Sequence, residues 1–262
     1  SHYCYQGVIY GDADELSRFC DFVGDEWFIG DSSFAEYVVI PSSFDWFNDA
    51  TDLDIGDLDG DGDLDVVVVV RMNNVFWYEN QGGSWTEHTV GSLSGYKTAV
   101  ELGDLDGDGD LDVVATSYVS DPNGGEVSWF ANDGSWTKTV IDSSFTYFVR
   151  DLSLDDMDGD GDLDVVVAAD IISWFENGAS WVEHSIGSYS NVGELDLVDL
   201  DGDGDLDVVF IESTQMKWLE NGNSWAVSII VGSNYLDGLS IGDLDGDGDL
   251  DVYTGEWDSY DP

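Results

Sequence analysis

Aspartate residues recur in this sequence at a spacing that suits the binding of a hard metal cation. The string Asp-Leu-Asp-Gly-Asp-Gly-Asp-Leu-Asp, with Met157 for the first Leu in one copy, occurs at 57–65, 104–112, 156–164, 199–207 and 243–251. Carboxylates at positions 1, 3 and 5 converge when glycine at position 6 allows a sharp turn. The pattern therefore predicts a cation site in each of the five copies.

Each copy is predicted to offer four side-chain ligands and one backbone ligand. Positions 1, 3 and 5 match the first half of an EF-hand loop, position 7 supplies a backbone carbonyl, and position 9 replaces the Glu at EF-hand position 12. The side-chain ligands are Asp57, Asp59, Asp61, Asp65, Asp104, Asp106, Asp108, Asp112, Asp156, Asp158, Asp160, Asp164, Asp199, Asp201, Asp203, Asp207, Asp243, Asp245, Asp247 and Asp251. The backbone ligands are Asp63, Asp110, Asp162, Asp205 and Asp249.

All-oxygen ligation in crowded, flexible loops favours calcium over magnesium, which demands stricter octahedral geometry at shorter distances. Five calcium ions are therefore predicted. The alternative is that the loops are solvated acidic turns, as most charge runs are. None of the five copies contains a Lys or Arg, and converging carboxylates without a cation repel one another. This favours the metal sites.

The charge balance excludes some classes of partner. The chain has 57 Asp and Glu against 6 Lys and Arg, for a formal net charge of -51. Binding to nucleic acid or to an anionic bilayer depends on clustered Lys and Arg. The longest aliphatic run, Val66 to Val70, is far shorter than the roughly 20 residues that span a membrane. We therefore expect neither nucleic-acid binding nor membrane insertion.

The Asp loops belong to a longer repeat of about 45 residues, the length of a four-stranded β-propeller blade. A segment that alternates with period 2 precedes each loop, and an apolar run such as Val66 to Val70 follows it. Next come a Trp-containing segment, as in Val75 to Asn80, a short polar turn and a second Ser-Trp segment. Each repeat is thus predicted as strand, Asp loop, strand, loop, strand, tight turn, strand.

The ends of the chain suggest how the array closes. The fifth loop is followed only by residues 252–262, without a Trp hairpin, whereas residues 27–40 resemble the third and fourth strands of the other repeats. The fold class is therefore all-β: a propeller of five four-stranded blades within 24–262, with six or seven blades as the alternative. The predicted blades are 44–92, 93–143, 144–187, 188–232, and 233–262 completed by the hairpin 24–43.

Residues 1–23 are expected to form an extension outside the repeats. They contain Cys4 and Cys20, the only two cysteines. A disulfide that pins this extension agrees with secretion, and two free thiols are the alternative.

These motifs resemble a known family. The Asp-x-Asp-Gly-Asp-Gly-x-x-Asp loop, followed by Trp-Phe-Glu-Asn and Trp-x-Glu-His, is similar to the FG-GAP/VCBS repeat family, and integrin α-subunit propellers carry a related loop. The resemblance covers about residues 25–257. It implies that the loop joins the first and second strands of a blade, and that the propeller serves adhesion, cell-surface assembly, sugar binding or support of a catalytic domain.

Aromatic residues recur in the predicted connections between blades, at the end opposite the Asp loops. They are Trp46, Tyr96, Tyr147, Tyr189 and Tyr235. A ring of aromatic side chains at a propeller mouth suits stacking on sugar rings or contact with a protein partner. The alternative is that these residues pack between blades.

The leading functional hypothesis is a non-catalytic, calcium-binding module outside the cell, with a structural, adhesive or protein-interaction role. Its partner would be another protein, a second copy of the chain, or a glycan. We predict no catalytic residues, because His88 and His184 occupy equivalent repeat positions, as structural residues do. The alternatives are a calcium-dependent lectin and a polysaccharide-degrading propeller enzyme or its accessory domain, for which Arg150 with Tyr147 is the candidate site.

Overall fold

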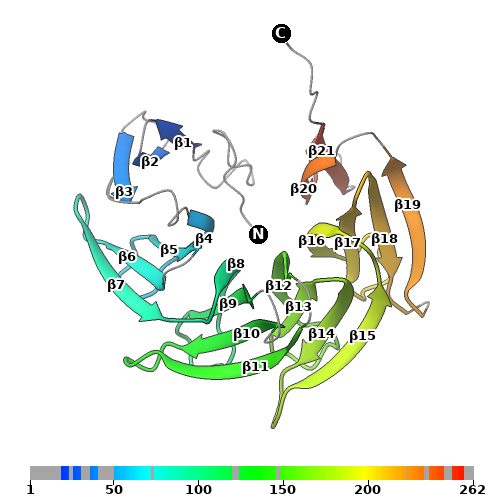
Figure 1. Ribbon diagram of the computed structural model, residues 1–262, viewed down its shortest axis with the longest axis horizontal. Coiled ribbons are helices and arrows are strands. Elements are labelled where there is room, and N and C mark those ends of the chain that lie inside the picture. The colour runs from blue at the N-terminus through cyan, green and yellow to red at the C-terminus, as the bar shows by residue number, and fades with distance from the viewer. Residues whose placement is uncertain are drawn as a thin grey trace. The chain divides into compact units, whose positions relative to one another are not determined.

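The computed structural model describes residues 19–23, 26–30, 36–40, 50–71, 74–119, 124–145, 148–222, 224–232, 236–244 and 250–256. Every regular element in these ranges is a β-strand, and every strand pairing is antiparallel. Within the same ranges, no helix has the length and apolar character needed to cross a membrane. The chain is therefore all-β, as the sequence predicts (Figure 1).

Four sheets have four strands each, in which neighbours along the chain are neighbours in the sheet. The first two comprise β4 (Ala50–Gly56), β5 (Asp65–Val70), β6 (Val75–Asn80) and β7 (Trp85–Gly91), then β8 (Tyr96–Gly103), β9 (Asp112–Val119), β10 (Gly124–Ala131) and β11 (Thr137–Phe145). The next two comprise β12 (Asp151–Asp155), β13 (Asp164–Ala168), β14 (Ile171–Glu176) and β15 (Val182–Ser188), then β16 (Val192–Val198), β17 (Asp207–Glu212), β18 (Gln215–Glu220) and β19 (Ala226–Gly232). The predicted strand order of a repeat is confirmed in all four.

Two smaller sheets lie at the ends of the described chain. β1 (Phe19–Val23), β2 (Glu26–Gly30) and β3 (Glu36–Ile40) form a three-stranded sheet, and β20 (Leu236–Gly242) pairs with β21 (Asp251–Glu256). β2 and β3 form the antiparallel hairpin expected in this region. β1 lies in the segment predicted as an extension, and Cys20 of β1 is opposite Ile29 of β2.

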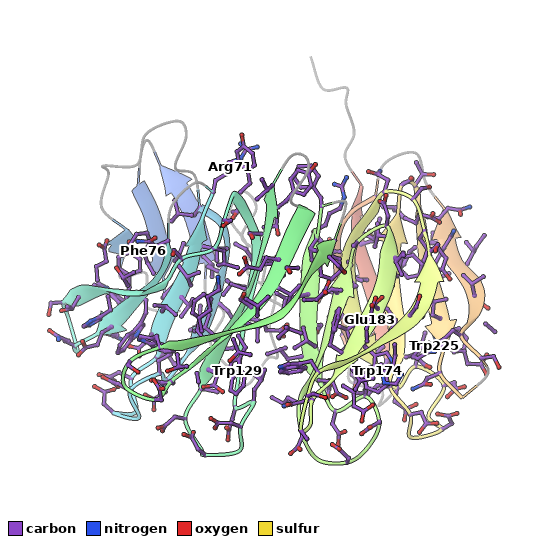
Figure 2. All side chains as sticks on the ribbon, turned by 60° about the horizontal axis from the view of Figure 1, so that its bottom comes forward. Arg71, Phe76, Trp129, Trp174, Glu183 and Trp225 are labelled. Atoms are coloured by element: carbon purple, nitrogen blue, oxygen red, sulfur yellow. The ribbon has the colours of Figure 1, made fainter. Side chains whose placement is uncertain are left out.

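Burial explains why the repeats form these strands. β5 is the apolar run of the first repeat, and all six of its residues are buried, because both of its faces are covered. The outermost strands β7 and β15 instead consist mostly of exposed and half-buried residues, with Val90 of β7 buried, and Glu183 is among the exposed ones (Figure 2). Side chains of a strand point alternately to its two faces. Both faces are covered in β5, whereas β7 and β15 have a face that meets solvent.

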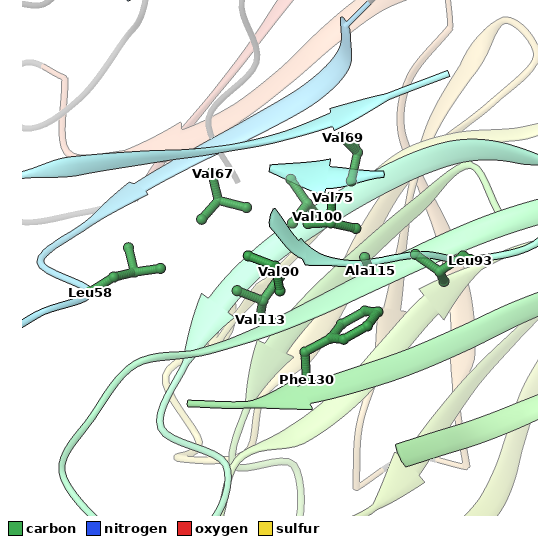
Figure 3. Close-up of a cluster of buried hydrophobic side chains, with 10 residues drawn as sticks. All are labelled: Leu58, Val67, Val69, Val75, Val90, Leu93, Val100, Val113, Ala115 and Phe130. Carbon is green, nitrogen blue, oxygen red and sulfur yellow. The ribbon is translucent and has the colours of Figure 1, made fainter. Parts of the chain in front are cut away.

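The chain forms two compact units. The first comprises Ser1–Asp104 and Asp108–Ser144, and the second comprises Leu105–Gly107 and Phe145–Pro262. Within each unit, neighbouring sheets share one core. In the first unit, Val67 and Val69 of β5 pack with Val100 of β8, Val113 of β9 and Phe130 of β10 (Figure 3). A single repeat therefore cannot bury its apolar residues alone.

The second unit has the same kind of core. Val166 and Ala168 of β13 lie in one cluster with Val208 and Phe210 of β17 and with Leu219 of β18. All five side chains are fully buried. The shared core between consecutive repeats is thus a property of both units.

Acidic side chains on the first strand of a sheet also join it to the next sheet. In the first unit, the Asp52 carboxylate accepts a hydrogen bond from the Val100 backbone N–H at 2.9 Å. Asp54 accepts one from Leu102 N–H, also at 2.9 Å. Two carboxylates on β4 thereby accept hydrogen bonds from backbone N–H groups of β8. The pattern of alternating acidic and aliphatic residues did not indicate these bonds.

The same arrangement recurs in the second unit. Asp151 of β12 accepts from Leu195 N–H of β16 at 2.9 Å, and Glu194 of β16 accepts from Leu239 N–H of β20 at 2.7 Å. Some of the acidic side chains therefore accept hydrogen bonds from backbone N–H groups of the neighbouring sheet.

Candidate metal centres

The Asp loops connect the first and second strands of each repeat, and glycine sets their backbone path. Gly60 and Gly62, at loop positions 4 and 6, have φ of 73° and 93°. A Cβ atom at either position would meet nothing within 4 Å. The backbone conformation, and not lack of space, therefore requires glycine here. The corresponding glycines at 107, 109, 159, 161, 202 and 204 have φ between 72° and 99°.

The loop folds around the first aspartate. In the first copy, Asp57 Oδ1 accepts a hydrogen bond from Asp61 N–H at 3.1 Å and Oδ2 accepts one from Gly62 N–H at 3.0 Å. The same two bonds, at 2.9 to 3.1 Å, recur at Asp104, Asp156 and Asp199. Four loops thus share these two bonds, which the nearly identical sequence explains.

This geometry gathers carboxylate oxygens. In each of four loops, one oxygen from each of three aspartates lies within 4.8 Å of the others. The groups are Asp57, Asp59 and Asp61; Asp104, Asp106 and Asp108; Asp156, Asp158 and Asp164; and Asp199, Asp201 and Asp203. Such clusters can bind a metal ion, and a donor set made only of oxygen fits a hard cation and disfavours a soft one.

The aspartate at position 9 differs from the others because it is buried. Asp65 is fully buried, and so are Asp112, Asp164 and Asp207. Asp65 Oδ2 accepts from Leu58 N–H at 3.1 Å, and Oδ1 accepts from Asn80 N–H at 2.8 Å. This residue therefore closes the loop and ties it to the end of the third strand.

Burial also changes the ionisation of this residue. It raises the pKa of Asp65, against the lowering effect of the N–H donors from Asn80 and Leu58. It raises the pKa of Asp164 to about 6, and the nearby charges of Asp158 and Asp160 add to the rise. A cation would reverse this effect, because metal ligation requires the deprotonated carboxylate.

Part of the sequence that includes these loops matches a known family. A model of the FG-GAP-like repeat matches residues 57–115, 104–167 and 199–254, more than half of the chain. The chain belongs to the FG-GAP-like repeat family. A search of curated proteins finds no match to it.

Two solved structures are similar to this chain in fold. One is a lectin of Agrocybe aegerita that recognises non-reducing terminal N-acetylglucosamine, with a TM-score of 0.57 and 20% identity over 87% of this chain and 68% of that one. The other is BBS1N in complex with ARL6DN, with a TM-score of 0.56 and 12% identity over 86% of this chain and 68% of that one. At these identities the likeness concerns the fold alone.

The Asn that ends the third-strand motif of these FG-GAP-like repeats holds the loops together. Asn132 N–H donates to Asp112 Oδ1 at 2.7 Å. Its side-chain Nδ2 donates to Leu111 O of the same loop at 3.1 Å and to Leu58 O of the preceding loop at 2.8 Å. This Asn is part of the sequence motif, but the motif alone predicts no role for it. Its fixed place after each Trp segment was the available signal.

Asn177 repeats these contacts in the second unit. Its N–H donates to Asp164 Oδ1 at 2.7 Å, and its Nδ2 donates to Leu163 O at 3.1 Å and to Leu105 O at 2.7 Å. Loop closure and the link to the preceding loop thus depend on the same side chain in both units.

The fifth loop is described only at its two ends. Asp245, Asp247 and Asp249 lie outside the described residues. Asp251 Oδ2 accepts from Leu244 N–H at 3.0 Å, which is the closing bond of the other loops. The assignment of side-chain and carbonyl ligands in all five loops stays a prediction.

Two of the predicted surface aromatics are described, and they differ. Tyr96 is 37% exposed, and the Arg71 guanidinium lies 5.5 Å from the centre of its ring. Tyr189 packs at 4.8 Å from the ring of Phe210 and joins the core, in line with the packing alternative. Trp46, Tyr147, Tyr235 and Cys4 lie outside the described residues, and so does the side chain of Cys20.

The two repeat histidines have equivalent surroundings. His88 Nε2 lies 2.7 Å from Glu79 Oε2, and its ring stacks on Trp77 with the centroids 4.4 Å apart. His184 lies 2.8 Å from Glu176 Oε2 and stacks on Trp174 at 4.2 Å. Because the same arrangement occurs in two repeats, it indicates a structural contact.

Proposed function

We propose that this chain is a non-catalytic, calcium-binding β-propeller that acts outside the cell as a structural, adhesive or protein-interaction module. The observation that carries the proposal is the repeated carboxylate cluster. Four described loops have the same backbone hydrogen bonds and bring three carboxylate oxygens within 4.8 Å of one another. Four equal sites of this kind suit a structural metal, whereas an active site needs one irregular group of residues.

Each ion would be held by the aspartates at positions 1, 3, 5 and 9 and by the carbonyl of position 7. Bound calcium would neutralise the converging carboxylates and link the loop to the strands that carry it. Position 9 has a particular part in this, because Asp65 already holds the backbone of Leu58 and Asn80. Metal binding and closure of the loop are thus coupled through one buried side chain.

We further propose five ions and five blades. The sheet that contains the hairpin β2–β3 would complete the repeat of β20 and β21 through β1, because β2 already pairs with β1 on one side and with β3 on the other. A disulfide between Cys4 and Cys20 would fix the start of the chain. Support comes from the length of the sheets: four repeats have four strands, whereas β20 and β21 form a sheet of two. Closure of the array would remove a free sheet edge.

Calcium supply and cysteine chemistry support the proposed location outside the cell. Extracellular calcium modules work with dissociation constants as weak as about 10⁻³ M, so even weak sites would be filled there. A disulfide persists in the same oxidising compartments.

The deciding experiment is calorimetric melting of the whole chain with calcium and with excess chelator. We expect a much lower Tm in chelator, because an ion that binds only the folded state stabilises it. Calcium should restore the Tm, and the same concentration of magnesium should restore much less. Titration of the decalcified chain should give five ions. A Tm that is the same with and without chelator would refute the proposal.

A lectin is the second candidate, and Tyr96 is the observation that favours it. Its ring is partly exposed, with the exposed Arg71 beside it. An aromatic ring suits stacking on a sugar, and guanidinium suits a carboxylate or sulfate on that sugar. The structurally similar Agrocybe aegerita lectin binds a sugar. Glycan-array binding that Tyr96→Ala abolishes would support this function, and absence of binding to every glycan would dismiss it.

For the enzyme alternative, the described surroundings of Arg150 offer a structural role. Its Nη2 donates to Asn191 Oδ1 at 3.0 Å, and its backbone N–H donates to Ala168 O at 2.8 Å. Assay of acidic polysaccharides with the wild type and Arg150→Ala tests this alternative directly. Degradation that depends on Arg150 would replace the non-catalytic proposal.

A further inference from the structure

The outermost strand of the fourth four-stranded sheet, β19, exposes aliphatic side chains to solvent. Val227 is 51% exposed and Ile229 is 59% exposed. β19 pairs with β18 on one side, and within the described residues no strand pairs with its other side. The strand therefore offers both apolar side chains and free backbone donors and acceptors.

Three equivalent strands in the same chain show what normally occupies this place. Counted from the Trp that precedes or begins each outer strand, the second residue is Glu87 in β7, Lys138 in β11 and Glu183 in β15. All three are exposed, and in β19 the same position is Val227. Charged residues on an edge strand prevent pairing with another chain. β19 has no ionisable residue at all.

The exposure of these two side chains is not the result of an absent neighbour. The residue two places further on is Thr89, Val140, Ser185 or Ile229, and all four are exposed. Both positions therefore face solvent in each of the four four-stranded sheets. Ile230 is different, since it matches Val90, which is buried against the next sheet. The apolar edge therefore consists of Val227 and Ile229.

The charge of the molecule restricts where a second copy of the chain can approach. Two copies with a formal charge of -51 each repel one another wherever acidic surfaces meet. β19 is a stretch of seven residues without charge, so it is the described outer strand at which a second copy can approach most closely. An antiparallel strand pair is also self-complementary about a two-fold axis, because each strand offers the other the same donors and acceptors.

We propose that two copies of this chain associate through antiparallel pairing of their β19 strands, so that the fourth sheets of both copies become one continuous sheet. Val227 and Ile229 of each copy are then covered by the same residues of the other. A pair of strand edges buries little area compared with a standard interface. The dimer is therefore weak, and monovalent salt strengthens it by screening the repulsion between the copies.

The test is sedimentation velocity of the whole chain, in calcium, over a series of protein and sodium chloride concentrations. The wild type should form a dimer whose population rises with both. The variant V227E/I229T copies the pattern of Glu87 and Thr89 in β7. It should raise the dissociation constant by about tenfold or more, the equivalent of 1.4 kcal/mol or more. Its Tm should remain that of the wild type.

The matched control is Val140→Thr in β11. Val140 is 48% exposed at the position that corresponds to Ile229, but the charged Lys138 lies on the same strand and opposes pairing with another chain. This variant should dimerise like the wild type. Hydrogen exchange adds a local readout, since the β19 amides should become protected as concentration rises while those of β7 should not.

Three results would overturn the inference. They are a wild type that stays monomeric over the whole series, a V227E/I229T variant that dimerises unchanged, and a mass that grows past the dimer. Protection of β19 only when a different protein is added would reassign the edge to that partner, and would equally refute self-association. None of these results depends on whether the calcium proposal holds, because calcium is present throughout.

Discussion

Asn132 and Leu58 are 74 residues apart in the chain, yet the Asn132 Nδ2 donates a 2.8 Å hydrogen bond to the Leu58 carbonyl oxygen. Leu58 lies in the first Asp loop, and Asn132 follows the third strand of the second repeat. The side chain of Leu58 is buried in the core that the two repeats share. One loop is thus fixed to its neighbour by both its side chain and its backbone.

We expect Asn132→Ala to lower the free energy of unfolding by about 1–3 kcal/mol, because it leaves two backbone carbonyls without their donor. Asn80→Ala is the matched control, since the Asn80 Nδ2 donates only to Leu64 O of its own loop, at 3.2 Å. It should cost less. Chemical denaturation of both variants in calcium measures the difference, and equal losses would show that the link between the loops contributes nothing.

Position 9 of the loop should respond to mutation differently from position 3. Asp164 is buried, and its two oxygens accept from Met157 N–H and Asn177 N–H. An Asn at 164 would turn an N–H₂ group toward one of these donors. We therefore expect Asp164→Asn to lower the stability of the protein even in chelator, by about 1–3 kcal/mol.

Asp158→Asn is the comparison for this change, because Asp158 lies in the same loop at an exposed position and accepts from Asp160 N–H through Oδ1, a bond that an amide oxygen can keep. It should mainly weaken calcium binding and cost little in chelator. Melting of both variants with and without calcium separates the two effects. A similar profile for the two would contradict the structural role of position 9.

The raised pKa of Asp164 predicts an unusual pH dependence for the decalcified protein. The pKa is about 6 in the folded chain against an ordinary value of 3.8, because of burial. The folded state therefore holds this proton more tightly than the unfolded state. The resulting stabilisation is complete below about pH 4 and is lost as the pH rises through 6. In chelator, Tm should increase as the pH falls from 7 to 5.

With calcium present, the sign should reverse, because protons compete with the metal for the carboxylates. Asp164→Asn should flatten the slope in chelator, which assigns the effect to this residue. Calorimetric scans at several pH values measure both slopes. A Tm in chelator that falls between pH 7 and pH 5 would refute the assignment.

The order of strands within a repeat could be predicted from the sequence because its signals are local. The apolar run Val66 to Val70, the glycines of the loop and the Trp segments each favour one conformation whatever surrounds them. Repetition of the same signals then shows which segments are equivalent. The convergence of positions 1, 3 and 5 in three loops follows from the same local rules.

Roles that depend on a neighbouring repeat could not be predicted in this way. Asp52 and Asp54 look like ordinary solvent-facing residues of a strand, and only the position of the next strand shows that they bind its N–H groups. The residue type at position 9 is the same as at the other ligand positions. Its burial and its hydrogen bonds to the end of the third strand could therefore not be predicted from the pattern of aspartates.

The carboxylates between sheets lead to a prediction in which two similar mutations change stability with opposite signs. Asp54 Oδ2 accepts from Leu102 N–H at 2.9 Å, and Oδ1 accepts from Ile55 N–H at 2.8 Å. An amide can accept only one of these bonds. We therefore expect Asp54→Asn to lower the free energy of unfolding by about 1–3 kcal/mol.

Asp142→Asn removes one charge as well, but Asp142 is half-buried and accepts only from Ser144, two residues away, at 2.9 and 3.0 Å. In a chain with a net charge of -51, loss of a negative charge relieves repulsion. This variant should be as stable as the wild type or slightly more stable. Denaturant titration at high and low salt compares the pair. If Asp54→Asn also stabilised the protein, the acidic residues of the first strands would be ordinary surface charges and not links between sheets.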